Sequence, residues 1–163
     1  GAGSPDFAKT SARERLDDPA TWIWSESDLV FLDFLREAKR RGFRVILDGV
    51  FNHVGVDHPA FLDVKERGVE SPFADWFSIR SWDPFEYDGW AGFDELPAFR
   101  KSPEHGIASR TLRDHLAAVT RRWMDPDGDG DYFGDAMDLD DFVLRPAMFS
   151  SDVHNENAQR IQH

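Results

Sequence analysis

Three polar side chains lie within six positions of one another in the segment VILDGVFNHVG, residues 45–55. They are the acid Asp48, the amide Asn52 and the imidazole His53. The apolar run around Asp48 is typical of a buried strand, so Asn52 and His53 stand where that strand would end. An acid, an amide and an imidazole grouped there could hydrogen-bond a polar ligand. The same amide and imidazole could also cap a strand end by bonding to backbone groups, and these residues alone leave both interpretations open.

A second group of residues that could bind a ligand lies in the acidic loop DPDGDGD. The loop carries aspartates at alternate positions: Asp125, Asp127, Asp129 and Asp131. Ca²⁺ takes about six to eight oxygen ligands, and a loop hinged by glycines can fold several carboxylates around one ion. The loop resembles the first half of an EF-hand loop, although its twelfth position is Ala136 instead of a glutamate. It predicts either a Ca²⁺ site or a solvated acidic turn.

The elements that must position these residues are indicated by hydrophobic periodicity. Leucines at helical spacing predict an amphipathic helix over residues 28–41, with Ser27 as its N-cap and Gly42 as its C-terminal stop. The β-branched, apolar run over 44–51 predicts a strand buried on both faces, as in a parallel sheet. A second amphipathic helix is predicted over 111–124. A helix, a glycine turn and a buried strand form half of a repeating α/β unit.

Residues 71–105 differ in character, because they are dense in aromatic residues, Pro and Gly and show no sustained period. We interpret them as an irregular insertion packed by its own side chains. Its flat aromatic side chains suit the CH faces of pyranose rings, and they include Trp76, Trp82, Tyr87 and Trp90. Aromatic residues supply core area first, so we expect most of these four in the core and one or two of them beside a sugar.

The composition of the chain narrows the classes of partner. The chain has 163 residues, a net charge of −12 and no cysteine. Nucleic-acid binding draws on clustered Lys and Arg, so we expect no nucleic-acid partner. No stretch approaches the roughly 18 apolar residues of a membrane span, so we expect no membrane partner, and the absence of a visible leader slightly favours a cytoplasmic location. No feature of the sequence indicates an oligomeric state.

The segment DGVFNHVG resembles the first signature region of the α-amylase family of glycoside hydrolases, at the end of the third strand of their barrel. The segments HPAFLDVKERGVESPFADWF, GWAGFDELPAFR and TRRWMDPDGDGD are similar to the neopullulanase and cyclomaltodextrinase branch, and the resemblance spans roughly residues 17–131. It implies that Asp48 supports a hydrogen-bond network and that Asn52 orients a loop or a metal ion. It also implies that His53 hydrogen-bonds the sugar of an α-glucan or maltooligosaccharide substrate.

The fold implied by this resemblance is α/β, a partial (β/α)8 TIM barrel with an irregular aromatic-rich insertion after the third strand. The chain then divides into an N-terminal tail or scar (1–17), a helix–strand unit with the DGVFNH motif (18–70), an insertion resembling domain B (71–105), and a final region (106–163). That final region would hold a helix, the acidic loop and a divergent fourth strand.

The catalytic carboxylates are harder to place, because the chain departs from the family pattern after the acidic loop. The family nucleophile lies in a strand reading close to GFRLDVANE, and FSSDVHNE, residues 149–156, aligns with it without a gap. This alignment makes Asp152 the nucleophile candidate and puts Ser150 in place of the arginine that keeps the nucleophile ionised. A competing alignment of MDLDDF makes Asp140 the candidate, and a third puts Asn155 in place of an acid of a later segment. Every alignment loses an arginine or an acid.

We therefore predict a segment of a retaining glycoside hydrolase that acts on α-glucosidic bonds of maltodextrins, cyclodextrins or pullulan. Such enzymes need two carboxyl groups about 5 Å apart, and a full barrel takes about 250 residues. For this reason we expect the isolated chain to be incomplete or inactive. The alternative is a non-catalytic carbohydrate- or calcium-binding remnant of the same family.

Overall fold

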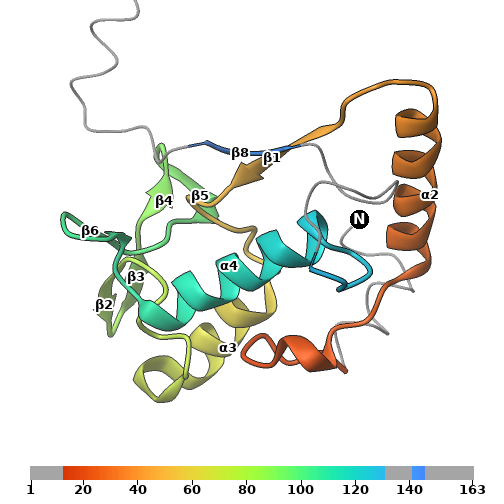
Figure 1. Ribbon diagram of the computed structural model, residues 1–163. Helices are drawn as coiled ribbons and strands as arrows, with labels where there is room; N and C mark the ends of the chain where they lie inside the picture. Colours follow the sequence, from red (N-terminus) through yellow and green to blue (C-terminus); the bar gives the residue numbers. More distant parts are fainter. Residues whose placement is uncertain (1–12, 131–140, 146–163) are drawn as a thin grey trace, which may run out of the picture.

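The structure is a computed structural model, and it describes residues 13–130 and 141–145. Its helices are η1 (Pro19–Thr21), α2 (Glu26–Arg40), α3 (Pro59–Arg67), η2 (Gly68–Glu70) and α4 (Arg110–Met124). Its strands are β1 (Ile46–Val50), β2 (Ile79–Trp82), β3 (Phe85–Tyr87), β4 (Gly89–Trp90), β5 (Phe93–Pro97), β6 (Lys101–Ser102), β7 (Gly106–Ile107) and β8 (Asp141–Arg145). Figure 1 shows α4 running through the middle, with the short strands on one side and α2 on the other. Within the described residues, no helix is both long enough and apolar enough to cross a membrane.

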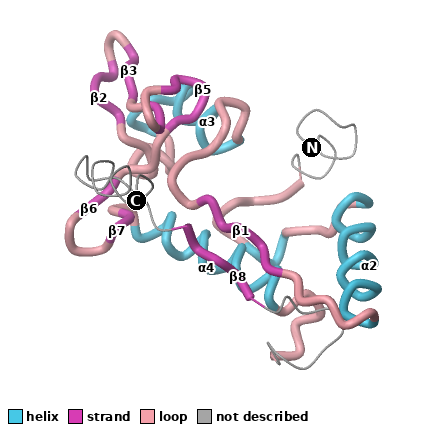
Figure 2. The backbone as a smooth tube through the Cα atoms, turned by 90° about the horizontal axis from the view of Figure 1, so that it is seen from above, coloured by secondary structure: helices cyan, strands magenta, loops and turns pink. Residues whose placement is uncertain are grey.

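Strands β1 and β8 form a parallel pair, which confirms the predicted strand and its parallel pairing. The register sets Asp48 beside Val143 and Val50 beside Arg145. Figure 2 shows the two strands next to each other and near α4. A parallel pair needs a long crossover connection, and here the connection contains α3, the short strands β2 to β7 and α4.

Only one face of β1 is buried, which corrects the predicted burial on both faces. Gly49 is buried, and Leu47 packs against the buried leucines of α2. On the other face, Ile46 is 54% exposed and Val50 is 44% exposed. Side chains alternate between the faces of a strand, so Asp48 shares the open face with them. A complete parallel sheet is covered by helices on both faces. The described part of this sheet has two strands, and only the face that carries Leu47 and Gly49 is covered.

Helix α2 begins with a capping box. The Ser25 hydroxyl accepts a hydrogen bond from the Asp28 backbone N–H at 3.1 Å, and the Asp28 carboxylate accepts one from the Ser25 backbone N–H at 2.9 Å. The N-cap is therefore Ser25, and the predicted cap Ser27 lies inside the helix. At the other end Gly42 has a φ of +82°, a left-handed conformation that glycine adopts without steric cost, and the helix stops there as predicted.

Helix α3 is an element that the sequence analysis did not predict. Its N-cap is His58, whose Nδ1 accepts a hydrogen bond from the Ala60 backbone N–H at 3.3 Å, and Pro59 stands in its first turn. Proline suits that position because its missing N–H would have no helical partner there. Phe61 and Val64 project from one side of the helix and are fully buried. The short helix thus serves mainly to insert these two side chains into the core.

The segment between α3 and α4 consists of short antiparallel pairs. β2 pairs with β3, β4 with β5, and β6 with β7, and the register shifts within the first two of these pairs. Isolated bridges join Phe99 to Phe77 and Ala98 to His53. The segment therefore folds back on itself and returns, just after β5, to the residues that follow β1.

The buried core consists of two clusters joined by α4. The first, which we call the aromatic cluster, combines residues from α3, the segment 71–105 and α4: Ala60, Phe61, Val64, Trp76, Phe77, Phe99 and Leu112. The second, which we call the strand cluster, has the buried residues Leu32 and Leu35, with Trp123 packed against them. The first turn of α4 thus contributes to one cluster and its last turn to the other. This confirms the helix predicted over 111–124 and its apolar face.

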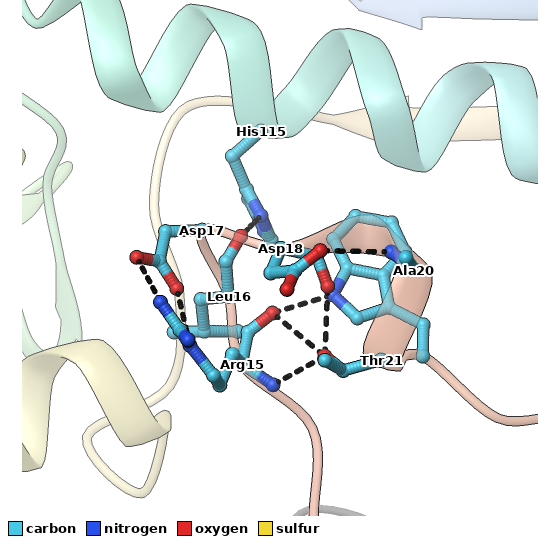
Figure 3. A network of polar contacts seen from close by, with 8 residues as sticks. Arg15, Leu16, Asp17, Asp18, Ala20, Thr21 and His115 are labelled. Carbon is cyan, nitrogen blue, oxygen red and sulfur yellow. Dashed lines mark hydrogen bonds and ion pairs between the residues drawn. The ribbon is translucent and has the colours of Figure 1, made fainter.

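The N-terminal segment is fastened to α4, as Figure 3 shows. The Trp22 indole N–H donates to the Arg15 carbonyl at 2.8 Å, which closes the segment into a turn. Nδ1 of His115 on α4 lies 2.8 Å from the Leu16 carbonyl oxygen. The His115 ring is also flanked by Trp22 and Trp76, with centroids 5.3 Å and 5.1 Å away. One histidine therefore ties the N-terminal turn to the aromatic cluster.

Candidate functional site

The chain just beyond β1 is held by pairing with the segment 97–99. The Asn52 carbonyl accepts a hydrogen bond from the Phe99 backbone N–H at 2.9 Å. The next residue, His53, pairs with Ala98 in an isolated bridge. In parallel α/β barrels the functional side chains sit at the C-terminal ends of the strands. Asn52 and His53 occupy such a position, and the returning segment fixes their backbone.

Two buried polar atoms at this strand end have no hydrogen-bond partner among the described residues. They are Oδ1 of Asn52, a residue that is 7% exposed, and Nδ1 of His53. Roughly 90% or more of buried polar groups in proteins are paired, so two neighbouring exceptions are unusual. Asp48, the third residue of the motif, lies within β1 and is exposed on its open face. The structure thus brings Asn52 and His53 to one point and places Asp48 further back along the strand.

The His53 ring is surrounded so that its neutral form is favoured. It lies against Trp90, with ring centroids 4.9 Å apart and planes at 32°. Burial lowers the pKa of His53, and the ammonium of Lys101 lowers it further. Lys101 donates from Nζ to the Phe51 carbonyl at 3.4 Å, and partial burial lowers its own pKa as well. The sequence analysis did not identify Lys101, because nothing along the chain ties that lysine to residue 53.

The aromatic residues considered for sugar stacking divide between the core and the surface. Trp76 is buried in the aromatic cluster, and Tyr87 packs against that cluster. Trp82 is exposed, and Trp90 lies over the ring of His53. Two of the four therefore belong to the core. Trp90 is the one that the fold places at the end of β1.

The carboxylates of the acidic loop converge. Asp125, Asp127 and Asp129 each offer an oxygen, and these oxygens lie within 4.8 Å of one another. Oδ2 of Asp125 accepts a hydrogen bond from the Gly130 backbone N–H at 3.2 Å, while its Oδ1 is buried without a partner in the described part of the chain. Three carboxylate oxygens grouped in this way suit a hard cation such as Ca²⁺. Asp131, the fourth aspartate of the motif, lies outside the described residues.

The candidate nucleophile Asp152 and its alternative Asp140 lie outside the described residues, as does Asn155, which one alignment puts in place of a family acid. The strand beside β1 is formed by residues 141–145.

Comparison with known proteins shows which family the chain resembles. Residues 28–139 match the family described as "Alpha amylase, catalytic domain". Neopullulanase 2 from Thermoactinomyces vulgaris is 34% identical over 104 residues, covering 61% of this chain and 17% of that protein. The solved structure of the type III pullulan hydrolase from Thermococcus kodakarensis has a TM-score of 0.55 at 37% identity, covering 70% of this chain and 18% of that one. The cyclic alpha-maltosyl-(1→6)-maltose hydrolase from Arthrobacter globiformis, in complex with maltose, has a TM-score of 0.53 at 30% identity and covers 70% and 23%.

These similarities confirm the family and the branch predicted from the sequence, since other matching relatives are named cyclomaltodextrinase and maltogenic alpha-amylase. They also support a (β/α)8 fold, of which this chain forms a part. The chain spans less than a quarter of each of the three proteins described above. The matched residues include β1, the strand end with Asn52 and His53, and α4. The chain therefore belongs to the alpha-amylase family of glycoside hydrolases, as a part of its catalytic domain.

Proposed function

We propose that this chain holds a sugar unit of an α-glucan at the C-terminal end of β1, as part of an alpha-amylase-type glycosidase. The observation that carries the proposal is that two polar residues lie side by side at this strand end: Asn52, which is buried, and His53, whose pKa is lowered. A neutral imidazole keeps one N–H donor, and the oxygen of a sugar hydroxyl can accept a hydrogen bond from it. Because Nδ1 of His53 is buried, Nε2 is the nitrogen that would face the sugar.

The proposed substrates are neutral glucans such as maltodextrins, cyclodextrins and pullulan. A net charge of −12 repels polyanions and leaves a neutral carbohydrate unaffected. The matching proteins are named as hydrolases of pullulan or of a cyclic maltosyl saccharide, which supports the same class. Trp90 adds an apolar aromatic surface beside His53, and aromatic rings of this kind suit the CH faces of a pyranose.

We further propose that the 163-residue chain binds such sugars without hydrolysing them. Retaining glycosidases require a nucleophilic carboxylate and an acid/base carboxyl about 5 Å apart. Each alignment of the segment that would carry the nucleophile loses an arginine or an acid of the family pattern. This loss supports the second candidate function, a non-catalytic carbohydrate- or calcium-binding remnant. Asp152 stays the predicted nucleophile if the chain is catalytic.

The proposed domain layout follows the order of the elements. Residues 18–70 would supply a helix–strand unit, residues 71–105 the insertion that follows the third barrel strand, and residues 106–163 the next helix and strand. The position of the short strands between β1 and α4 supports this layout, as does their return to the end of β1.

Calorimetric titration with maltotriose tests the binding role. We expect the unaltered chain to bind and His53→Ala to weaken binding by up to about tenfold, the worth of one hydrogen bond to a neutral group. His105→Ala is the matched control, because His105 is an exposed histidine of the β6–β7 turn. No heat of binding from the unaltered chain, or equal weakening by the two variants, would show that the strand end does not hold the sugar.

An assay with p-nitrophenyl maltoside and with cyclodextrin tests the absence of chemistry. We expect no turnover from the purified chain, and none from Asp152→Asn. Turnover in the range of about 1 to 1,000 per second that is usual for enzymes, abolished by Asp152→Asn, would establish catalysis and identify the nucleophile. Turnover that survives this change would point to Asp140 as the next carboxylate to replace.

We also propose that Asp125, Asp127 and Asp129 bind Ca²⁺, with Asp131 as a further ligand. The convergence of their oxygens supports this, as does the buried, unpaired Oδ1 of Asp125. A ligand that binds only the folded state stabilises it by about 2.7 kcal/mol at 100 times its Kd. Thermal melts with Ca²⁺ and with chelator should therefore separate, and Asp127→Asn should bring them together while the exposed Asp94→Asn does not. Identical melts of the unaltered chain over a wide Ca²⁺ range would reject the site.

A further inference from the structure

Two side chains from the segment between α3 and α4 determine the surroundings of His53. Trp90, the last residue of β4, covers the imidazole with its centroid 4.9 Å away. Lys101, the first residue of β6, reaches the Phe51 carbonyl two residues before His53. Its N···O distance of 3.4 Å is long for a hydrogen bond. Burial is the larger cause of the lowered His53 pKa, and the ammonium of Lys101 is the smaller one. Neither residue is near His53 in the sequence, and the pairing of 97–99 with the strand end brings both to it.

The buried nitrogen of His53 decides which tautomer the ring adopts. Nδ1 is buried and has no partner among the described residues. A buried N–H without a partner is rarer in proteins than a buried acceptor without one, so the proton is favoured on Nε2. Protonating the ring would also place a charged, unpaired N–H at Nδ1, and burying an unpaired charge is costly. The geometry therefore favours a neutral imidazole that presents an Nε2–H donor.

The charge of the whole chain acts in the opposite direction. With a net charge of −12, the average field of the protein stabilises cations, and an unshielded histidine would gain a proton more readily. Local features must offset this field if His53 is to stay neutral. Trp90 does so by excluding water from one face of the ring, and Lys101 does so because its ammonium repels an imidazolium.

We propose that Trp90 is a positioning residue for His53, which keeps the imidazole neutral and presents its Nε2–H to the sugar, and that Lys101 reinforces the neutral form. This inference rests on the sugar-binding role proposed above for the strand end. It adds that the segment 71–105 prepares the histidine before any sugar arrives. A sugar oxygen would then accept a hydrogen bond from Nε2 without the cost of first moving the proton from Nδ1 to Nε2.

Nitrogen-15 NMR of the histidine rings, recorded against pH without sugar, tests the proposal. In the unaltered 163-residue chain we expect His53 to show the Nε2–H tautomer and a pKa below the ordinary histidine value. Trp90→Ala should raise the His53 pKa and mix the tautomers, because water then reaches the ring. Trp90→Phe, which restores an aromatic cover, should recover most of the change. Lys101→Met should raise the pKa by less than Trp90→Ala does, because burial is the larger cause of the lowered value.

Controls within the same spectra separate positioning from misfolding. The resonance missing from His53→Ala identifies the ring. The resonances of His58, the N-cap of α3, and of His115, whose ring lies against Trp76, report whether each variant is folded. Lys65→Met removes an exposed lysine from α3 and should leave the His53 titration unchanged.

Unchanged His53 pKa and tautomer in a folded Trp90→Ala variant would overturn the proposal. A loss of maltotriose affinity with that unchanged titration would also overturn it, because Trp90 would then contact the sugar directly. Failure of the unaltered chain to bind maltotriose would instead refute the proposed function. The titration would still decide whether Trp90 and Lys101 set the state of the ring, because it contains no sugar.

Discussion

The aromatic cluster and the strand cluster differ in how completely they are closed. In the aromatic cluster, residues from α3, the short-strand segment and α4 bury one another. In the strand cluster only Leu32 and Leu35 are buried, while apolar side chains of the same elements, such as Val30, Phe34 and Ile46, are exposed. The aromatic cluster is built from a nearly continuous stretch of chain. A barrel strand and its helix, by contrast, are covered by neighbouring units of the barrel. The difference shows that the segment between α3 and α4 can complete its own core while β1 and α2 keep apolar side chains exposed.

The largest expected effect concerns the interior of the aromatic cluster. Phe61 is fully buried among Phe77, Phe85 and Tyr87, so Phe61→Ala should cost about 3–5 kcal/mol of unfolding free energy. Phe34→Ala, on the exposed side of α2, should change it by less than about 0.5 kcal/mol. Urea unfolding of both variants measures the contrast. Similar losses would mean that the strand side is as well packed as the aromatic side.

The next effect is a pH dependence of the aromatic cluster. Burial, and then the nearby His115, lower the pKa of His58 from 6.5 to about 4, with Asp57 opposing. Between these two values the unfolded chain binds a proton that the folded chain refuses, so stability falls as the pH falls through this window. One histidine with such a shift should cost about 3 kcal/mol between pH 7 and pH 4.

The variant His58→Asn isolates that contribution, because asparagine keeps the N-cap of α3 and does not titrate. Subtracting its urea-unfolding profile from that of the unaltered chain removes the common contribution of the carboxylates. The difference should decline from pH 6.5 to pH 4 and level off below. A difference that is flat across this range would show that His58 is not buried in its neutral form.

The smallest effect concerns the far end of α4, next to the strand cluster. The guanidinium carbon of Arg122 lies 3.8 Å from the ring centroid of Trp24, a cation–π contact. Arg122→Ala should cost about 0.5–2 kcal/mol, measured by urea unfolding at low and high salt. Arg121→Ala is the matched control, because Arg121 is exposed on the same turn and should cost little. Equal losses in the two variants would mean that helix propensity, rather than the contact with Trp24, accounts for the change.

Elements with local signals were predicted well. α2 and α4 have an apolar face at helical spacing, and the stop at Gly42 follows from the left-handed conformation there. The cap of α2 was misplaced by two residues, although Ser25 and Asp28 already form a capping box in the sequence. α3 was missed because histidine is an uncommon cap and the helix is short. The exposure of Ile46 and Val50 depends on which helices or strands pack against β1. The residues of the strand itself do not show this, so it could not be predicted from them.

The residues of the candidate site also fall into two groups, those with a local sequence signal and those brought together only by the fold. Asn52 and His53 lie at the end of β1, where the motif predicted them, and their role in binding a sugar stays a prediction. Trp90 was considered as a sugar platform, but its contact with His53 depends on the return of the segment 97–99 to the strand end. Lys101 reaches the site through the same pairing. The role of Asp152 stays a prediction of the sequence alone.

Native-state hydrogen exchange, resolved by residue on the 163-residue chain, tests the contrast between the two clusters most directly. Amides that open only with global unfolding exchange slowest, while those in loosely packed parts exchange through smaller openings. The account predicts the slowest exchange in α3 and the first half of α4, and faster exchange in β1 and α2. The Phe99 amide, bonded to the Asn52 carbonyl, should be protected along with α3. Protection of β1 and α2 equal to that of α3 would contradict the account, because the strand cluster would then be as closed as the aromatic one.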